Sequence, residues 1–277
     1  MVDSPLSSSV EAQGGPFRCG GGVPVPPTAV ILAAGQSKRM RSDVVKVLHE
    51  VAGRPMLAWV IEACKGVGCN PVFVVIGHQG EQVRDAFADD PVVQFVEQRE
   101  RLGTGHAVAR AESALSGYSG EVIVLAGDGP LVRTDTLRTL LAAHRESGAE
   151  ASLATSVIDE PAGYGRIIRG ENRDFLGIVE EKDATEKERV VREINPSYYC
   201  FNACALFDAL KKISNQNASG EYYLTDVFSI LRENGKRITV VDAVPPEDVL
   251  SINTQEQLAE VSSIMESRLT ALEETQS

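Results

Sequence analysis

The chain has 277 residues, 43% of them hydrophobic and 24% charged, which is the ordinary composition of a globular protein with a sizeable core. The formal net charge of −12 disfavours nucleic acid and acidic membranes as partners, because both bind to a basic face. No apolar run approaches the roughly 20 residues of a membrane helix, and no secretory signal pattern opens the chain, so we expect a cytoplasmic protein.

The first 27 residues differ in composition from the rest of the chain. They are rich in Ser, Gly, Pro and Val and contain no periodic pattern. Such a segment cannot bury enough apolar surface to offset its chain entropy. We therefore predict a disordered N-terminal tail over residues 1–27.

From Thr28 onward, short β-branched runs alternate with segments of helical periodicity. The predicted buried strands are TAVILAA, PVFVVIG, VVQFV and EVIVLAG. Helices are predicted between them in PMLAWVIEACKGVG, GEQVRDAFAD and TGHAVARAESAL. This alternation predicts a doubly wound α/β unit, whose parallel sheet is covered by helices on both faces.

The pattern changes after about Gly148, where strand-like runs follow one another closely. These runs are ASLATSVI, GRIIRG, FLGIVEEKD and YYCFNACALF. We expect them to form a β-rich region over the carboxyl edge of the sheet, where open α/β sheets bind ligands. A helix and a strand are then predicted in YYLTDVFSILREN and RITVVDAV, and a last helix from about Thr254 to the end.

The cysteines indicate neither a disulfide framework nor a metal site. Their number is odd, and those after the first lie in apolar segments that suit buried thiols. The five are Cys19, Cys64, Cys69, Cys200 and Cys204. The last two have no histidine nearby, so a zinc site with four nitrogen or sulfur ligands is not expected.

The segment after the first predicted strand combines small residues with clustered positive charge. Ala34, Gly35 and Ser37 let an anion approach the backbone closely, and backbone amides at a strand end can point at it. Four cationic side chains follow within nine residues: Lys38, Arg39, Arg41 and Lys46. The spacing fits neither the Walker pattern nor G-x-G-x-x-G. We predict a loop that grips a triphosphate, the alternative being a surface turn with solvated lysines.

Several motifs in one order carry a more specific resemblance. They are VILAAGQSKRMRSDVVKVLHEVAGRPM, EQRERLGTGHAV, LAGDGPL, GYGRI, GIVEEKDA, EIN, NASGEYYLTDV and SIN followed by QL. Together they cover about Ala29 to Leu258. The chain thereby resembles the sugar-nucleotidyltransferase family, and within it the bacterial uridyltransferase domains that act on N-acetylglucosamine 1-phosphate.

The resemblance implies both a fold and a reaction. The fold is Rossmann-like α/β, a doubly wound, mixed but mostly parallel sheet with a β-rich sugar-binding insertion, known as the nucleotide-diphospho-sugar transferase fold. The reaction joins UTP to N-acetylglucosamine 1-phosphate and gives UDP-N-acetylglucosamine and pyrophosphate, with Mg²⁺ as cofactor. The expected partners are a nucleoside triphosphate and a sugar 1-phosphate.

The resemblance also implies a division of the chain. We expect a nucleotidyltransferase domain over residues 28–253 and a C-terminal helix over 254–277. The bifunctional members of the family continue into a left-handed β-helix with acetyltransferase activity, which also builds a trimer. No hexapeptide repeats follow Leu258, so we expect no acetyltransfer, and a monomer or weak oligomer rather than that trimer.

By the same resemblance, Arg39 and Lys46 are the catalytic residues. Arg39 would brace the triphosphate, and Lys46 would bridge the phosphates of both substrates as charge builds in the transition state. Asp128 and Asn253 would be the two protein ligands of Mg²⁺, which binds oxygen and keeps several waters. The alternatives are a helix or turn cap for Asp128 and the N-cap of the final helix for Asn253.

The remaining expected contacts are to the substrates. Five of them lie at strand ends, namely Leu32, Ala33, Ala34, Gly35 and Gly127. Those to the uracil edge are Gln98, Gly103 and Thr104, and those to the sugar are Gly165, Glu180 and Asn195. An amide suits a ring that offers both a donor and acceptors. Taken alone, GTG is a turn before a helix, and Glu180 is one more acid in a solvated run. The chemistry leaves His49 and His106 no necessary task.

At a few positions the chain has residues that differ from those usual in the motifs of this family. They are Ser37 and Lys38 in the loop, Val45 before the lysine, Ala126 before the Gly-Asp pair, and Pro196 and Ser197 after the sugar-binding asparagine. These departures leave open another sugar phosphate or nucleotide. A non-catalytic nucleotide-sugar-binding module is a third reading, although such a module would be free to lose Arg39, Lys46, Asp128 or Asn253, and all four are present.

Overall fold

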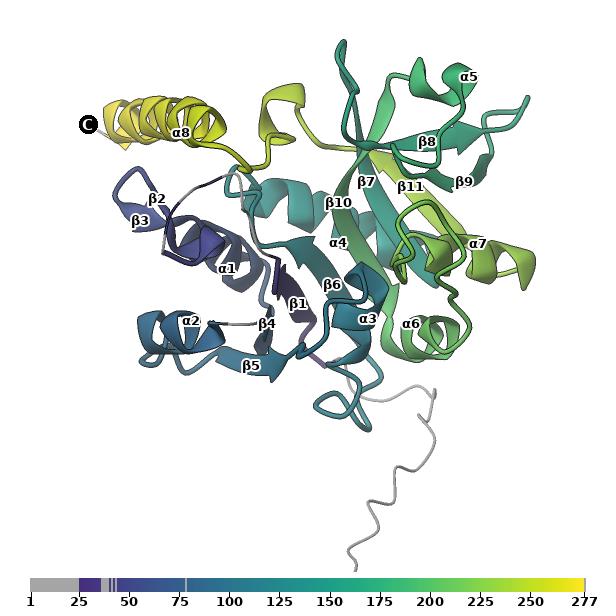
Figure 1. Cartoon of the computed structure of the whole chain (residues 1–277), viewed down its shortest axis with the longest axis horizontal. Helices are drawn as coiled ribbons and strands as arrows, with labels where there is room; N and C mark the ends of the chain where they lie inside the picture. Colours follow the sequence, from purple (N-terminus) through teal and green to yellow (C-terminus); the bar gives the residue numbers. More distant parts are fainter. Residues whose placement is uncertain (1–24, 36–39, 41, 43, 78, 277) are drawn as a thin grey trace, which may run out of the picture.

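The structure is a computed structural model that describes residues 25–35, 40, 42, 44–77 and 79–276. A nine-stranded mixed sheet runs through the molecule, with helices on both of its faces (Figure 1). Its strands are β1 (Thr28–Ala33), β4 (Val72–Ile76), β5 (Val93–Glu97), β6 (Glu121–Ala126), β7 (Ala151–Val157), β8 (Gly165–Arg169), β9 (Phe175–Val179), β10 (Glu193–Asn202) and β11 (Ile238–Asp242). A separate two-stranded sheet pairs β2 (Glu50–Val51) with β3 (Arg54–Pro55).

The order of the strands creates a switch point beside β1. The main path runs β11-β7-β10-β6-β1-β4-β5, and β8 and β9 extend it from β10. The chain therefore leaves β1 toward β4 and β5, and then returns to the other side of β1 as β6. These four strands are parallel, so their carboxyl ends share one edge. In open α/β sheets, a ligand crevice forms outside such an edge.

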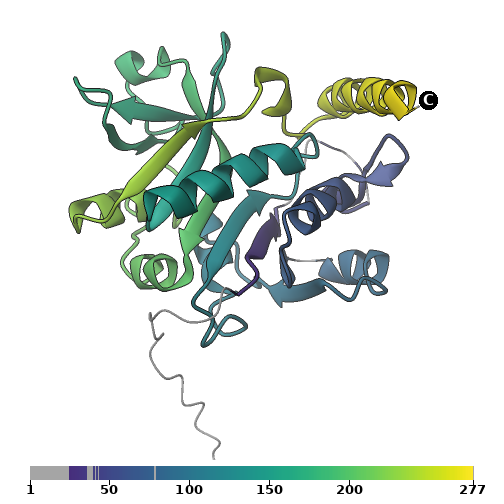
Figure 2. The ribbon, with the colours of Figure 1, turned by 180° about the vertical axis from the view of Figure 1, so that it is seen from behind.

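Helices cover both faces of the sheet, as Figures 1 and 2 show from opposite sides. The α-helices are α1 (Met56–Gly66), α2 (Gly80–Ala86), α3 (Thr104–Ala109), α4 (Thr134–Ser147), α5 (Glu186–Arg189), α6 (Ala203–Leu210), α7 (Asp226–Glu233) and α8 (Gln255–Gln276). Short 3₁₀ helices within the described segments include η2 (Lys46–Leu48) and η3 (Pro246–Asp248).

The strands feed two separate cores because their side chains alternate. In β1, Ala29 and Ile31 pack in the core that holds α1 and α4, whereas Val30 packs in the core that holds α3, α6 and α7. Both faces of the central strands are therefore buried. This explains why they are continuous apolar runs and confirms the predicted doubly wound, mixed but mostly parallel sheet.

The second half of the chain differs from its prediction. β7, β10 and β11 belong to the main sheet itself, and only the β8–β9 hairpin is added beyond it. The run YYCFNACALF is not one strand, because β10 ends at Asn202 and α6 begins at Ala203. β10 is antiparallel to both β6 and β7, and this allows it to sit between two strands of the opposite direction.

The prediction of buried free thiols is correct for only some of the cysteines. Cys64, Cys69 and Cys200 are buried and free. Cys204 is disulfide-bonded, so the expectation of a buried free thiol is wrong there. Within the part of the chain that the structure describes, no helix has the length and apolar character needed to cross a bilayer.

Candidate active site

The backbones at the carboxyl ends of β1, β4 and β6 contact one another closely. Gly127 follows β6 and donates its N–H to the carbonyl oxygen of Leu32 at 2.9 Å. A Cβ on Gly127 would lie 3.1 Å from that oxygen, and one on Gly77, which follows β4, only 2.8 Å from the carbonyl oxygen of Ala34. Small residues are therefore required where these strands end. The edge places Leu32, Ala33, Ala34, Gly35 and Gly127 together, and Gly35 is exposed. The loop residues Ser37, Lys38, Arg39 and Arg41 lie outside the described residues.

Lys46 lies between the two residues predicted to hold a metal. Its ammonium Nζ makes an ion pair with Asp128 Oδ2 and donates to Asn253 Oδ1 at 2.8 Å. These residues are far apart in the chain, at η2, after β6 and before α8. The side chain of Lys46 is only 9% exposed, whereas that of Asp128 is 24% exposed. The carboxylate oxygen and the amide oxygen thus converge on one positive charge at the carboxyl edge.

This donor set fits a hard divalent cation. One carboxylate oxygen and one amide oxygen already share a point where a cation sits, and Mg²⁺ uses few protein oxygens and completes its shell with water and phosphate. Lys46 at the same point supplies a charge that phosphate oxygens would also attract. The described residues contain no cluster of three or more His, Cys, Asp or Glu that could hold a metal in another way.

Asn253 is not the cap of the last helix. Thr254 takes that role, because its Oγ1 accepts from the N–H of Gln257 at 3.2 Å. The Gln257 side chain returns the bond by accepting from the N–H groups of Asn253 and Thr254, at 2.7 and 3.2 Å. This is a capping box. The backbone beside Asn253 is also fixed, since Ile252 N–H donates to Asp128 O at 2.9 Å.

The predicted base-binding residues form one turn. Gln98 follows β5, is 4% exposed, and donates from Nε2 to Gly103 O at 3.1 Å. The same Nε2 lies 3.0 Å from His106 Nδ1. Gly103 has φ +116° and ψ 174°, a conformation that only glycine adopts readily. Thr104 begins α3, and its Oγ1 accepts from Leu224 N–H at 3.0 Å.

This turn packs against a segment that the sequence analysis did not assign to the site. Tyr222 N–H donates to Leu102 O at 2.7 Å, and Tyr222 O accepts from Gly105 N–H at 2.8 Å. A Cβ on Gly103 would lie only 2.5 Å from Tyr222 O. The glycine is therefore required both by its backbone angles and by the close approach of the Tyr222 backbone.

The predicted sugar-binding residues also lie together. A Cβ on Gly165, at the start of β8, would lie 3.5 Å from both Asn195 Cβ and Glu180 Oε2. Asn195 is 5% exposed, donates from Nδ2 to Tyr199 OH at 2.7 Å, and accepts from Ser197 N–H at 3.1 Å. Register in β10 shifts between Ile194 and Tyr198, and Ser197 has φ +67° at this bulge. The Pro196 and Ser197 departures therefore fall on a kink beside the sugar-binding asparagine.

Glu180 is more than a solvated acid. It is half-buried, and burial raises the pKa of its carboxyl above the ordinary value, although the Thr225 hydroxyl opposes the shift. Thr225 Oγ1 donates to Glu180 Oε1 at 2.9 Å and is 4% exposed. The sequence analysis missed Thr225 as a site residue. The only signal was its place in the quoted motif NASGEYYLTDV, since a threonine before a helix is an ordinary cap.

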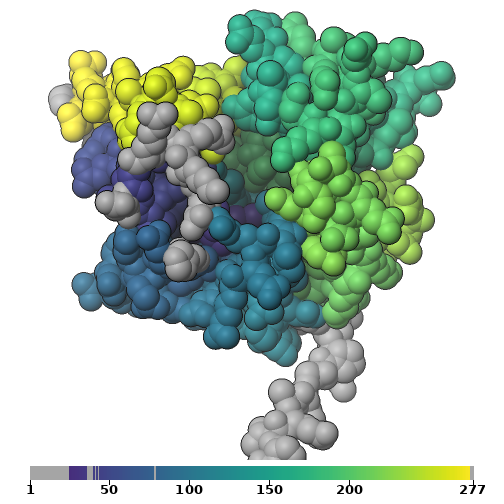
Figure 3. Space-filling view, viewed as in Figure 1, coloured from purple at the N-terminus to yellow at the C-terminus, as the bar shows by residue number. Residues whose placement is uncertain are grey.

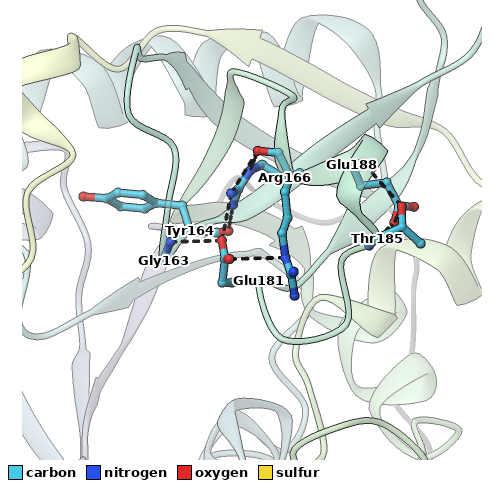
Figure 4. A network of polar contacts seen from close by, with 7 residues as sticks. Gly163, Tyr164, Arg166, Glu181, Thr185 and Glu188 are labelled. Carbon is cyan, nitrogen blue, oxygen red and sulfur yellow. Dashed lines mark hydrogen bonds and ion pairs between the residues drawn. The ribbon is translucent and has the colours of Figure 1, made fainter.

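A buried arginine holds the loop before Gly165 (Figure 4). Arg166 is 1% exposed, donates to Tyr164 O, and pairs with Glu181 Oε2 at 2.7 Å. The same Glu181 oxygen accepts from Gly163 N–H at 3.0 Å. The loop is thereby anchored on both sides of Tyr164, whose OH donates to Val249 O at 3.2 Å.

The space-filling view shows this face hollowed near its centre (Figure 3). The hollow lies between the blue part of the chain, which carries α3, and the green part, which carries β8 and β9. The base turn therefore lies on one side of the hollow and the sugar group on the other. The site residues predicted within the described part of the chain thus fall into four groups: the strand ends, the centre at Lys46, the base turn and the sugar group.

The chain is similar to known nucleotidyltransferases. Residues 29–216 match the MobA-like NTP transferase domain family. Bifunctional protein GlmU of Geobacter metallireducens is 47% identical over 241 residues, which cover 87% of this chain and 51% of that protein. Bifunctional protein GlmU of Geobacter sulfurreducens is 47% identical over 234 residues, 84% of this chain and 49% of that protein. The chain spans about half the length of these curated relatives.

Solved structures support the fold. UDP-glucose pyrophosphorylase complexed with UDP-glucose superposes with a TM-score of 0.72 at 17% identity, over 88% of this chain and 100% of the other. The apo form of UDP-glucose pyrophosphorylase gives a TM-score of 0.71 at 16% identity, over 87% and 98%. These matches confirm the nucleotide-diphospho-sugar transferase fold. With this fold and the family match over most of the sheet, the chain belongs to the MobA-like NTP transferase domain family.

Proposed function

We propose that the chain joins UTP to N-acetylglucosamine 1-phosphate, giving UDP-N-acetylglucosamine and pyrophosphate with Mg²⁺ as cofactor. One observation carries the proposal: Lys46, Asp128 and Asn253 converge on one point at the switch point of the sheet. The motif resemblance and the GlmU relatives support this reaction over other nucleotidyl transfers.

The chemistry requires charge neutralisation more than acid or base catalysis. The attacking phosphate oxygen is already ionised, and it must approach an α-phosphate that is also anionic. The Lys46 ammonium offsets the charge of both phosphates and orients them for in-line attack. Asp128 and Asn253 would hold Mg²⁺, which when bound neutralises phosphate charge. We assign Arg39 to bracing the triphosphate and the leaving pyrophosphate.

The base turn provides the specificity for uracil. Gln98 is held in place by its bond to Gly103 O and by packing of its buried stem. Because Nε2 already has Gly103 O and His106 Nδ1 as partners, the amide oxygen Oε1 is the group that Gln98 presents to the ring N–H of the base. Gly103 and Thr104 complete the turn and set the distance between the base and α3.

The sugar group provides the second half of the site. Glu180 can accept hydrogen bonds from sugar hydroxyls, and Asn195 is an amide suited to the acetamido group. Thr225 fixes one oxygen of Glu180 and leaves the other beside Gly165. A Cβ on Gly165 would lie 3.2 Å from Ile178 Cγ2 and in ordinary contact with Asn195 and Glu180, so glycine leaves the space between these two side chains open.

A different sugar 1-phosphate is the second candidate. The bulge at Pro196 and Ser197 lies directly beside Asn195. Most members of the family that the chain resembles have threonine and glycine at these two positions, so the wall that faces the sugar differs here. Ala126 likewise replaces a larger residue next to Gly127. Both changes affect which substrate fits and leave the cationic centre unchanged.

Pyrophosphate release with a panel of substrates tests these proposals. The full chain is assayed with Mg²⁺, each of four nucleoside triphosphates, and a set of sugar 1-phosphates. We expect the highest kcat/KM with UTP and N-acetylglucosamine 1-phosphate. A clear preference for another pair would replace the first candidate by the second, and no release with any pair would leave a non-catalytic nucleotide-sugar-binding module.

A further inference from the structure

A buried carboxylate joins three segments close to the cationic centre. Asp248, in η3, is 1% exposed and accepts from two arginines. Arg133 approaches with Nε 2.5 Å from Oδ2 and with a second nitrogen 3.0 Å from Oδ1, and Arg268 donates to Oδ1. We call Arg133, Asp248 and Arg268 the triad.

Both arginines belong to elements next to Asp128. Arg133 is the N-cap of α4, which begins six residues after Asp128. Arg268 comes from α8 and donates a second bond to the carbonyl oxygen of Leu131 at 3.1 Å. Its planar guanidinium therefore contacts the segment after Asp128 and the segment before Asn253 at once. A lysine could not span both contacts, because its ammonium is a single point of charge.

The segment from Asp248 to Asn253 is held on its other side too. Tyr198 OH donates to Asp248 O at 3.2 Å, and Tyr164 OH donates to Val249 O, also at 3.2 Å. At the far end, Ile252 N–H donates to Asp128 O at 2.9 Å. The triad thus closes a loop of contacts that sets where Asn253 lies relative to Asp128.

The Asp248 carboxylate is buried although its partners are not, since the side chains of Arg133 and Arg268 are 43% and 22% exposed, and this distinguishes the triad from an ordinary surface ion pair. An exposed ion pair contributes little to stability, whereas removing a partner of a buried charge leaves that charge uncompensated. Arg145 and Glu121 form a useful contrast, since their two bonds at 2.7 and 3.2 Å resemble those of the triad. Arg145 lies in α4 and Glu121 is the first residue of β6, so this pair sits at the end of β6 opposite to Asp128.

From this arrangement we propose that the triad is a positioning device for the active site, and that Arg268 makes α8 part of it. The triad sets the separation of the Asp128 and Asn253 oxygens without touching substrate. Loss of Arg268 would release the segment that carries Asn253, while the sheet remains. The proposal rests on the proposed function, because Asp128 and Asn253 are taken as the ligands of Mg²⁺.

Two measurements on the full chain test this role. Hydrogen exchange reports the Ile252 amide directly, and the Mg²⁺ concentration at half-maximal pyrophosphate release reports the cation site. In Arg268→Met we expect Ile252 to exchange at least about 10-fold faster and half-saturation to need about 10-fold more Mg²⁺, the range found for residues that orient metal ligands. In Arg268→Lys, which keeps the charge but not both contacts, both effects should be smaller.

Arg145→Met is the matched control and should leave both values at those of the wild type. Equal changes in Arg145→Met and Arg268→Met, or uniform faster exchange across the sheet in Arg268→Met, would overturn the positioning role. Unchanged Ile252 exchange in Arg268→Met would overturn it as well. If Arg268→Met does not fold, Arg268→Lys decides by the same two readouts. Absence of pyrophosphate release in the wild type would instead contradict the proposed function, and the exchange of Ile252 would still decide the role of the triad.

Discussion

Lys46 is the residue on which the proposed chemistry depends most. Its ammonium is nearly buried and lies at the meeting point of Asp128 and Asn253. Lys46→Ala should lower kcat by about 100-fold or more, the effect of removing one preorganised stabiliser of transition-state charge. The unfolding midpoint should change little, because Asp128 stays partly exposed to water. Steady-state kinetics and thermal unfolding check both parts, and unchanged kcat in a folded variant would refute the role of Lys46.

Glu180 makes a prediction about pH. Burial raises the pKa of this carboxyl above its ordinary value, so it takes up a proton at a higher pH than an exposed glutamate does. A protonated carboxyl accepts hydrogen bonds poorly, so KM for the sugar 1-phosphate should rise as pH falls through this raised pKa. Glu180→Gln cannot titrate and should show a higher KM that is flat over the same range. A wild-type profile as flat as that of Glu180→Gln would exclude this role.

Among single residues, the sequence identified the charged site residues better than the residues that hold them in place. Asp128 follows a buried strand and the cations cluster after another, so their types and positions indicate phosphate chemistry. Nothing local distinguishes Thr225 or Asp248 from an ordinary cap or surface acid. Their roles arise from partners 45 and 20 residues away in the chain, which only the folded arrangement brings near.

Among the elements, the turn that begins α3 depends on a single glycine. Gly103 adopts a backbone conformation that other residues rarely reach, and a Cβ there would lie 2.5 Å from Tyr222 O. Gly117 also has positive φ, +79°, but nothing lies within 4 Å of its Cβ position. Gly117→Ala should therefore lower the free energy of unfolding only by the backbone strain, about 1–2 kcal/mol.

Gly103→Ala should lower the free energy of unfolding more than the control Gly117→Ala does. It should also raise KM for UTP, because the Tyr222 backbone must move away from the base turn. Denaturant unfolding of both variants, with KM for each substrate, provides the comparison. A stability loss in Gly103→Ala no larger than that in Gly117→Ala, with KM for UTP unchanged, would show that the contact with Tyr222 does not matter.

The elements of the first half were easier to predict than those of the second. In β1, β4 and β6, β-branched residues buried on both faces produce unbroken apolar runs with helices between them. In the second half, β7 and β10 look like any other strands, and no local pattern states that β10 pairs antiparallel between β6 and β7. The run YYCFNACALF was misassigned because a strand and a helix join inside it without a Gly or Pro to mark the boundary.

For the whole molecule, the topology explains why distant motifs lie at one edge of the sheet. β1 and β6 are parallel neighbours although almost 90 residues separate them, so the loops after both strands open at the same edge. The β8–β9 hairpin brings Gly165 and Glu180 over that edge, and the segment before α8 adds Asn253. The fold of the structural neighbours agrees with the strand topology.

Transfer of label from the α-phosphate of UTP tests the central claim most directly, namely that this edge catalyses nucleotidyl transfer. The full chain is incubated with α-³²P-labelled UTP, N-acetylglucosamine 1-phosphate and Mg²⁺, and the products are separated. We predict that label enters UDP-N-acetylglucosamine with one pyrophosphate released per transfer, and that Asp128→Asn, which weakens the cation site, slows the transfer strongly. Label that stays in UTP, in wild-type protein shown to bind UTP, would contradict the account.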